Sequence, residues 1–192
     1  MLLVGLSLSA CHAPEAPGSP DVAAWRAEKD RFMREAAGSP VPAESRASFP
    51  PLPYYAIDPV YRVPAGLAMA PGDEVLELPT STGLRRKMRK IGALQFTLKG
   101  QPLSLNAFVD ASTNDVRRLF VPFNDLTNGT ETYPGGRYLD LDRTATGFYD
   151  LDFNRAYHPF CVFNEKFDCP YPPKENRLPV PVRAGERLPA SP

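Results

Sequence analysis

The sequence has no excess of charge of either sign. Its 192 residues hold 22 lysines and arginines against 22 aspartates and glutamates. Without a net positive field, the chain cannot attract nucleic acid or an acidic membrane surface from a distance. We therefore expect no nucleic-acid partner.

The sequence also lacks a long hydrophobic run. Met1 to Cys11 is apolar or small apart from two serines, but it is much too short to cross a bilayer as a helix. It ends in Leu8–Cys11, which resembles a bacterial lipoprotein signal box, although the positive residues that begin an export signal are absent. We interpret residues 1–11 as this signal and Cys11 as the lipid-modified residue. The alternative is an apolar N-terminus with a chance cysteine.

Such an anchor would place the protein in the cell envelope, on the periplasmic or another extracytoplasmic side. The lipid would be its only membrane contact. Residues 12–20, which are mainly alanine, proline, glycine and serine, would then form a flexible tether. Residues 21–192 suffice for a single mainly β domain with a coil-rich C-terminal tail.

Cysteine is scarce, with three residues in the chain. If Cys11 carries lipid, Cys161 and Cys169 remain as a pair, and an oxidising envelope favours a disulfide between them. Closing so short a loop would stabilise the fold by about 2–3 kcal/mol. The alternative is a metal site in which His158 joins both thiolates, but a fourth ligand is not evident. We expect the disulfide and no metal.

Histidine and the common catalytic motifs are scarce too. The chain has two histidines, and it contains no phosphate-binding loop, nucleophile elbow, zinc-protease helix or dinucleotide fingerprint. These absences exclude the enzyme classes that depend on such motifs, and we expect no cofactor. His158 is the histidine suited to acid–base chemistry, because His12 lies beside the expected anchor.

Proline is abundant, with 23 residues, and it interrupts helices and sheet ladders. One helix is nevertheless expected at Val22–Ala37. Asp21 suits its N-cap, Trp25 and Phe32 recur with helical spacing, and Gly38 ends the pattern. The apolar stripe of this helix should pack on the core.

Most of the remaining chain has strand-like patterns. Residues 93–98 and 103–107 alternate between apolar and polar side chains around a turn at residues 99–102, which predicts a hairpin. The basic segment Thr82–Ile91 should form a strand with a solvated face, and anion binding there is the alternative. Further strands are expected near Tyr55–Val63, at Glu74–Leu78, Val116–Phe123 and Val180–Arg183, and as a pair at Arg137–Leu141 and Phe148–Phe153. This pattern predicts an α+β fold, mainly an antiparallel β roll or small barrel with one N-terminal helix.

Several segments resemble the bacterial domain-of-unknown-function family numbered 1684. The resemblance covers roughly Trp25 to Glu186, and it is carried by Val121–Thr127, Thr132–Leu141, Asp152–Cys161, Cys169–Asn176 and Ala184–Glu186. The family implies no established activity. Its signature lies in these polar loops, so the resemblance implies only the location of a site.

A long polar loop precedes Arg137. Gly135 and Gly136 would let the backbone approach a ligand, and Arg137 beside them would suit a carboxylate or phosphate. The alternative is a hairpin corner in which Arg137 pairs with Asp125 or Asp140. In both cases the guanidinium needs hydrogen-bond acceptors, so we expect Arg137 to lie within hydrogen-bonding reach of Asp125, Asp140 or Asp152.

Alternating acidic residues follow the loop. The spacing of Asp150, Asp152 and Asn154 imitates the start of a calcium-binding loop, but Arg155 stands where that loop requires glycine and Cys161 where it requires glutamate. This motif is therefore excluded.

We expect the polar residues of these segments to gather around one concavity and bind a small polar or anionic ligand. The candidate residues are Asp125, Thr127, Tyr133, Gly135, Gly136, Arg137, Asp140, Asp152, Asn154, Tyr157 and His158. One alternative is a hydrolase-type enzyme that uses Asp125, Asp140, Asp152 or His158 for acid–base chemistry, with or without a metal. Another is a structural envelope protein whose sheet face contacts other proteins. The sequence leaves the oligomeric state open.

Overall fold

The computed structural model describes residues 22–113 and 115–189, and within them it has one α-helix and seven strands. Short 3-10 helices occur in the connections, at Ala43–Ser48, Pro59–Tyr61, Phe153–Arg155, Phe160–Val162 and Lys174–Asn176. The regular elements are α1 (Val22–Glu35), β1 (Arg62–Met69), β2 (Val75–Pro79), β3 (Arg85–Leu98), β4 (Gln101–Asp110), β5 (Arg118–Phe123), β6 (Arg137–Asp142) and β7 (Phe148–Asp152).

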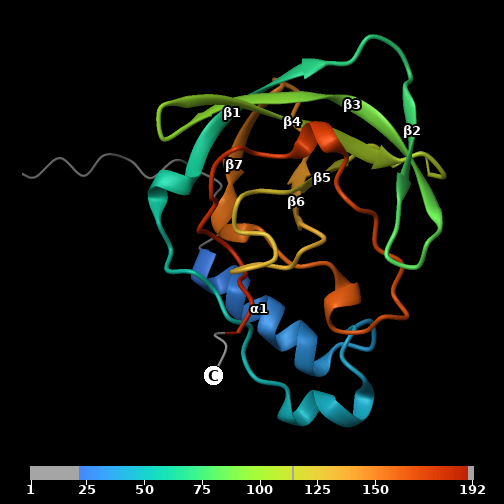
Figure 1. Ribbon diagram of the computed structural model, residues 1–192, viewed down its shortest axis with the longest axis vertical. Coiled ribbons are helices and arrows are strands. Elements are labelled where there is room, and N and C mark those ends of the chain that lie inside the picture. Colours follow the sequence, from blue (N-terminus) through green and yellow to red (C-terminus); the bar gives the residue numbers. More distant parts are fainter. Residues whose placement is uncertain (1–21, 114, 190–192) are drawn as a thin grey trace, which may run out of the picture.

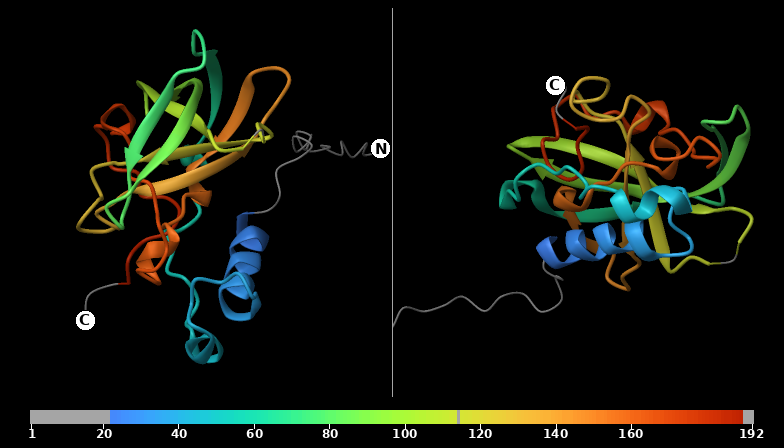
Figure 2. Two further views of the ribbon diagram at one scale, coloured as in Figure 1. Left: turned by 90° about the vertical axis from the view of Figure 1, so that its right-hand side faces the viewer. Right: turned by 90° about the horizontal axis from the view of Figure 1, so that it is seen from below.

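The strands form a single antiparallel sheet that curls into a nearly closed barrel (Figures 1 and 2). The strand order is β6-β5-β4-β3-β1-β7, and β2 pairs with the first half of β3 off this path. Helix α1 lies away from the hairpins, at the other side of the molecule in Figure 1. The expected α+β class, with a mainly antiparallel barrel and one N-terminal helix, is confirmed.

The β3–β4 hairpin contains the two longest strands of this sheet and lies in the middle of the strand order. The hairpin predicted from the sequence is confirmed. Leu98 pairs with Gln101, so the turn between the strands has only the two residues Lys99 and Gly100. Both have positive φ, 50° and 80°, as the hairpin turn that matches strand twist requires. The strict alternation read from the sequence therefore places one side of each strand inside the barrel.

Three details of the expected topology are wrong. The strand expected near Tyr55–Val63 begins only at Arg62, as β1, after the 3-10 helix Pro59–Tyr61. The strands β6 and β7 are not paired with each other: β6 pairs with β5, and β7 pairs with β1, at opposite ends of the strand order. Residues 180–183 form no strand. The pairing of β6 and β7 and the lack of a strand at residues 180–183 depend on contacts that are distant in sequence. Local sequence patterns do not encode such contacts.

The interior of the barrel and its outer face are both apolar at β5 and β6. Leu119, Val121 and Leu139 point inward and are fully or almost fully buried in the main core. Because side chains alternate along a strand, Phe120 and Tyr138 point to the outer face. An outer face with large rings needs a cover, and this requirement positions the site described below.

Helix α1 packs through a separate small core. Met33 is fully buried with Val41 and Leu52, and Phe32 packs against this cluster as predicted. Trp25, the other residue of the predicted stripe, is half-buried and belongs to none of the described core clusters. The helix ends at Glu35, two residues before the expected end. None of the described helices is long and apolar enough to span a membrane. Three expectations, the Asp21 cap, the Cys11 anchor and the tether at residues 12–20, lie outside the described residues.

Candidate functional site

Most of the polar residues singled out in the sequence lie inside the protein. Asp125, Thr127, Arg137, Asn154 and His158 are each at most 3% exposed. They hold the chain together through hydrogen bonds and do not line a common concavity. The expected gathering of all candidate residues around one cavity is therefore not what the structure shows.

Arg137 binds the C-terminal segment of its own chain. Its terminal nitrogens donate to the carbonyl oxygens of Val182 (2.6 Å), Ala184 (2.5 Å) and Glu186 (3.1 Å). One of them also donates to Asp125 Oδ2 at 2.9 Å, so the expected contact with an aspartate is present. The guanidinium is fully buried, and both terminal nitrogens are occupied. Arg137 is therefore not placed to receive an external anion.

The polar loop before Arg137 is folded by its own side chains. Asp125 Oδ1 accepts hydrogen bonds from the backbone N–H of Thr127 (2.8 Å), from the Thr127 hydroxyl (2.6 Å) and from the Val182 N–H (3.1 Å). The hydroxyls of Thr127 and Thr132 are 2.9 Å apart. This satisfaction of buried polar groups explains the composition of the loop without a ligand.

The two glycines of the loop are required by close packing within the chain. A Cβ atom on Gly135 would lie 2.4 Å from Cε1 of Tyr133. Gly136 has a φ of +93°, and a Cβ there would lie 2.7 Å from the Phe123 carbonyl oxygen. The expected close approach exists, but the partner is protein and not a ligand.

Asp152 and Asn154 have a similar structural role. Asp152 Oδ1 accepts from both the backbone N–H and the side-chain amide of Asn154, each at 2.9 Å. The amide of Asn154 in turn exchanges two hydrogen bonds with the backbone of Asp58, at 2.9 and 3.0 Å. These residues fix the segment before β1 onto the end of β7.

His158 is held in a neutral form by its surroundings. Its Nε2 accepts the Tyr133 N–H at 3.3 Å, and its backbone N–H donates to Glu186 Oε2 at 2.7 Å. Burial, with Arg137 and Lys29 nearby, lowers the pKa of His158 to about 3. The other oxygen of Glu186 lies 2.5 Å from Lys29 Nζ, which ties helix α1 to the C-terminal segment. His158 is thus a structural histidine.

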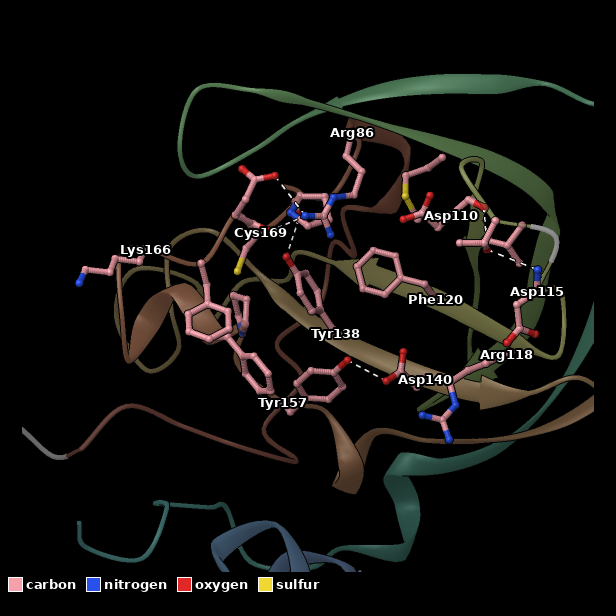
Figure 3. Close-up of a pocket in the computed structure, with 18 residues that line it drawn as sticks. Arg86, Asp110, Asp115, Arg118, Phe120, Tyr138, Asp140, Tyr157, Lys166 and Cys169 are labelled. Carbon is pink, nitrogen blue, oxygen red and sulfur yellow. Dashed lines mark hydrogen bonds and ion pairs between the residues drawn. The ribbon is translucent and has the colours of Figure 1, made fainter. Parts of the chain in front are cut away.

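A cavity of about 610 Å³ lies instead on the outer face of the barrel (Figure 3). Strands β3 to β6 supply one wall, and residues 157–170 cover them from the other side. Of the expected site residues, Asp140 and Tyr157 line this cavity, as does Cys169 from the expected disulfide. The other lining residues were not identified from the sequence.

Aromatic rings form the floor of the cavity. Phe120 and Tyr138 meet edge to face, with ring centroids 4.7 Å apart and planes at 74°. Tyr138 and Tyr157 also meet edge to face, at 5.7 Å and 89°. The hydroxyl of Tyr138 donates to the Pro170 carbonyl oxygen at 2.6 Å, which fixes the ring beneath the covering segment. Rigid ring faces and edges are thereby presented to the cavity.

Asp140 lies beside this floor, two residues after Tyr138 and opposite Phe120 across the β5–β6 ladder. Its Oδ2 accepts a hydrogen bond from the Tyr157 hydroxyl at 2.8 Å (Figure 3). The Asp140 carboxylate reaches solvent through the cavity, but many protein atoms lie around it. The resulting partial desolvation raises the pKa of Asp140. Desolvation and the neighbouring Asp140 raise the pKa of Tyr157 well above its usual value, so its hydroxyl remains the donor.

The four candidates for acid–base chemistry do not meet. Asp140 lines the cavity, whereas Asp125, Asp152 and His158 are buried elsewhere. These four described residues therefore form no carboxylate–histidine pair at the cavity. Among the described residues, no group of three or more His, Cys, Asp or Glu side chains lies close enough to hold a metal ion.

Cys161 and Cys169 lie side by side as free thiols. The backbone N–H of Cys161 donates to Cys169 Sγ at 3.2 Å. A hydrogen bond from the Cys169 thiol lowers the pKa of Cys161 to about 6. No disulfide joins the two residues in this structure, although they are neighbours as the expected pairing requires.

The aromatic lining could have been suspected from alternation alone. Along β5 and β6, Phe120 and Tyr138 fall between inward-facing aliphatic residues, which puts two large rings on the other face. What covers those rings is encoded in residues 157–170, far along the chain, and no local pattern links the two segments.

Comparison with known proteins gives a family and similar solved structures. A family model described as "Protein of unknown function (DUF1684)" matches residues 47–187. The solution NMR structure of an uncharacterized protein from gene locus rrnAC0354 of Haloarcula marismortui is 42% identical, with a TM-score of 0.69. The match covers 87% of this chain and 92% of that protein. No curated protein matches the chain significantly.

Proposed function

The chain belongs to the DUF1684 family, whose description names no activity, and we propose that it is a small-molecule-binding protein whose site is the cavity on the outer face of the barrel. The single observation behind this proposal is a concavity of about 610 Å³ with an aromatic floor, lined also by polar and charged side chains. Pockets for small molecules have this size, and aromatic side chains with polar groups beside them are common in their lining.

The aromatic side chains at the floor of the cavity are held rigidly, which supports a binding function for the cavity. Tyr138 is fixed by its bond to Pro170, and Tyr157 by its bond to Asp140. A preorganised site loses little conformational entropy when a ligand enters. Asp140 and the Tyr157 hydroxyl provide the polar contacts that would orient the ligand, so the expectation of a polar ligand is kept, at a different place from the polar loop.

The binding proposal is tested by a fragment screen with isotope-labelled protein. We expect some small aromatic or amphipathic fragments to shift backbone amide signals of the lining residues in a saturable manner, because they would pack on Phe120 and Tyr138. The amide of the remote β7 residue Asp150 serves as an internal control. A screen without saturable binders, or with shifts that map away from the cavity, would contradict the proposal.

We also propose a cellular localisation, which is based on the first residues of the sequence. Cys11 would carry the lipid, residues 12–20 would form the tether, and the domain would stand in the cell envelope on the periplasmic or another extracytoplasmic side. An oxidising environment would then join Cys161 and Cys169. The hydrogen bond from the Cys161 N–H to Cys169 Sγ supports this pairing, because it places the two cysteines side by side.

Mass spectrometry of the protein extracted from envelope membranes tests this address. We expect an N-terminal peptide that begins with lipid-modified Cys11, and a bridged peptide pair containing Cys161 and Cys169 that separates on reduction. Reduction should also lower the free energy of unfolding by about 2–3 kcal/mol. A C161S/C169S variant is the control, since its unfolding should not respond to reductant. An unmodified Cys11 would contradict the anchor, and free thiols at both other positions would contradict the disulfide.

A further inference from the structure

Some of the charged side chains that line the cavity form ion pairs with other residues of the protein, and others do not. Two arginines contribute to the lining, and both have acidic partners: Arg86 binds Asp168 at 3.1 Å, and Arg118 lies 3.5 Å from Asp142. In Figure 3 the Arg118 guanidinium points away from the Phe120 ring. The arginines are therefore committed to the protein's own carboxylates.

Two of the described lining carboxylates have no direct ion pair, although Arg86 acts on Asp110, and Arg118 and Lys29 act on Asp140, through longer-range electrostatics. Within the described residues, neither Asp110 nor Asp140 has a basic nitrogen within salt-bridge distance. Asp110 accepts hydrogen bonds from the backbone and hydroxyl of Ser112, and Asp140 accepts one from Tyr157. Lys166 is the remaining lining cation, and it is exposed on the covering segment, at the margin of the site in Figure 3.

Asp140 lies beside the aromatic rings, and this arrangement favours a positively charged ligand. Asp140 is directly opposite Phe120 across the β5–β6 ladder, and it is hydrogen-bonded to Tyr157. A positive group beside this carboxylate would also touch aromatic rings, whose faces attract cations. An anion at the same place would meet the carboxylate instead and would find the arginines already engaged.

One nearby lysine has to be considered. Lys29 Nζ lies 4.2 Å from the centre of the Tyr157 ring, on helix α1. It is paired with the buried Glu186 at 2.5 Å, so its charge is compensated within the protein. Lys29 does not line the cavity. Within the described residues, the lining charges without an ion-pair partner are therefore Asp110, Asp140 and the exposed Lys166.

We infer that the ligand of this cavity is a small organic cation, an amine or quaternary ammonium with an apolar part, whose positive group lies against Asp140 and the rings of Phe120 and Tyr157. The apolar part packs on the aromatic floor. This inference rests on the proposed function and narrows it from any small polar molecule to a cationic one.

The test uses four ring-matched probes that differ in charge: phenethylamine, its trimethylammonium analogue, phenethyl alcohol and hydrocinnamate. Affinities are measured at neutral pH by titration of the labelled protein. We expect both cations to bind at least about tenfold more tightly than the alcohol, and the anion to bind most weakly. Asp140→Asn should reduce cation affinity about tenfold and leave the alcohol nearly unchanged.

Two further variants separate charge from structure. Asp140→Glu keeps the charge and should restore most of the cation preference. Asp150→Asn makes the same chemical change at an exposed position of β7 outside the cavity, and it should leave all four affinities within about twofold. Because the asparagine side chain introduced by Asp140→Asn can still accept the Tyr157 hydroxyl, this variant should fold normally, which its amide spectrum verifies.

The outcomes distinguish this inference from the proposed function. Equal affinity for the cations and the alcohol, or a preference for the anion, would overturn the cationic ligand while binding in the cavity stands. If none of the four probes binds but neutral or anionic fragments from the screen occupy the cavity, the inference again fails alone. If nothing binds there at all, both fail together.

Discussion

Replacing Arg137 with methionine is expected to lower the free energy of unfolding by about 3–5 kcal/mol. The change leaves Asp125 as an uncompensated charge that is 2% exposed. It also removes the donors for the carbonyl groups of Val182, Ala184 and Glu186. Urea denaturation followed by circular dichroism measures the loss.

The matched control is Arg183→Met. Arg183 is likewise paired with a carboxylate, that of Glu131, through two nitrogens at 2.8 to 3.0 Å, but its side chain is 57% exposed. Exposed pairs contribute at most about 1 kcal/mol. Similar losses for the two variants would show that burial of the Arg137 pair does not matter. Adding Asp125→Asn to Arg137→Met should recover part of the stability, because the stranded charge is removed.

If Arg137→Met fails to fold, Arg137→Lys keeps the prediction testable. Lysine retains the charge but cannot fork between Asp125 and the carbonyl groups of Val182 and Ala184. We expect an intermediate loss of stability and faster amide exchange at Val182, whose N–H is bound to Asp125. Unchanged exchange there would contradict the role of Arg137 in holding the C-terminal segment.

The fold was more accessible from the sequence than the partners of its strands. Alternation at residues 93–98 and 103–107 predicted the β3–β4 hairpin because a tight turn makes pairing a local matter. The segments β6 and β7 have similar patterns and a short connection, yet each pairs with another strand. Closure of the barrel decides those partners, and closure depends on packing across the whole sheet.

The candidate site shows the same limit in another form. Polar residues such as Asp125 and Arg137 attracted attention because buried polar groups and ligand-binding groups have the same chemistry. Only the position of residues 182–186 reveals that backbone carbonyls occupy the guanidinium. Conversely, Phe120 and Tyr138 look like ordinary strand residues until the covering segment creates a cavity above them. Asp140 and Tyr157 were predicted as site residues because they are polar and lie in the segments that resemble the family.

Acidification is expected to destabilise the protein through His158 before the carboxylates titrate. The folded-state pKa of His158 is lowered to about 3, whereas an unfolded histidine has a pKa of about 6.5. Above pH 6.5 both states carry neutral His158, and its contribution to stability is fully present. As the pH falls from about 6.5 toward 3, the unfolded chain binds a proton that the folded chain does not. Stability should therefore fall by up to about 1.4 kcal/mol per pH unit in this window.

The direction follows from the groups around the ring. Protonation would break the acceptance of the Tyr133 N–H by Nε2, and it would place a charge near Arg137 in a buried site. Glu186 lies 3.7 Å from Nδ1 and favours the charged form, but Lys29 at 2.5 Å already compensates that carboxylate. The neutral ring is thus the form that fits the folded protein.

Unfolding free energies measured between pH 7 and pH 5 in the C161S/C169S background isolate this histidine, because that background removes the Cys161 thiol, whose pKa of about 6 lies in the same interval. Asp110 and Glu131 have lowered pKa values and add their own losses only at more acidic pH, whereas the raised pKa of Asp140 acts in the opposite direction. His158→Gln should abolish most of the slope in this interval. His12→Gln removes the other histidine of the chain and serves as the matched control, with the slope retained. A slope that survives in His158→Gln, or disappears in His12→Gln, would show that the acid sensitivity originates elsewhere.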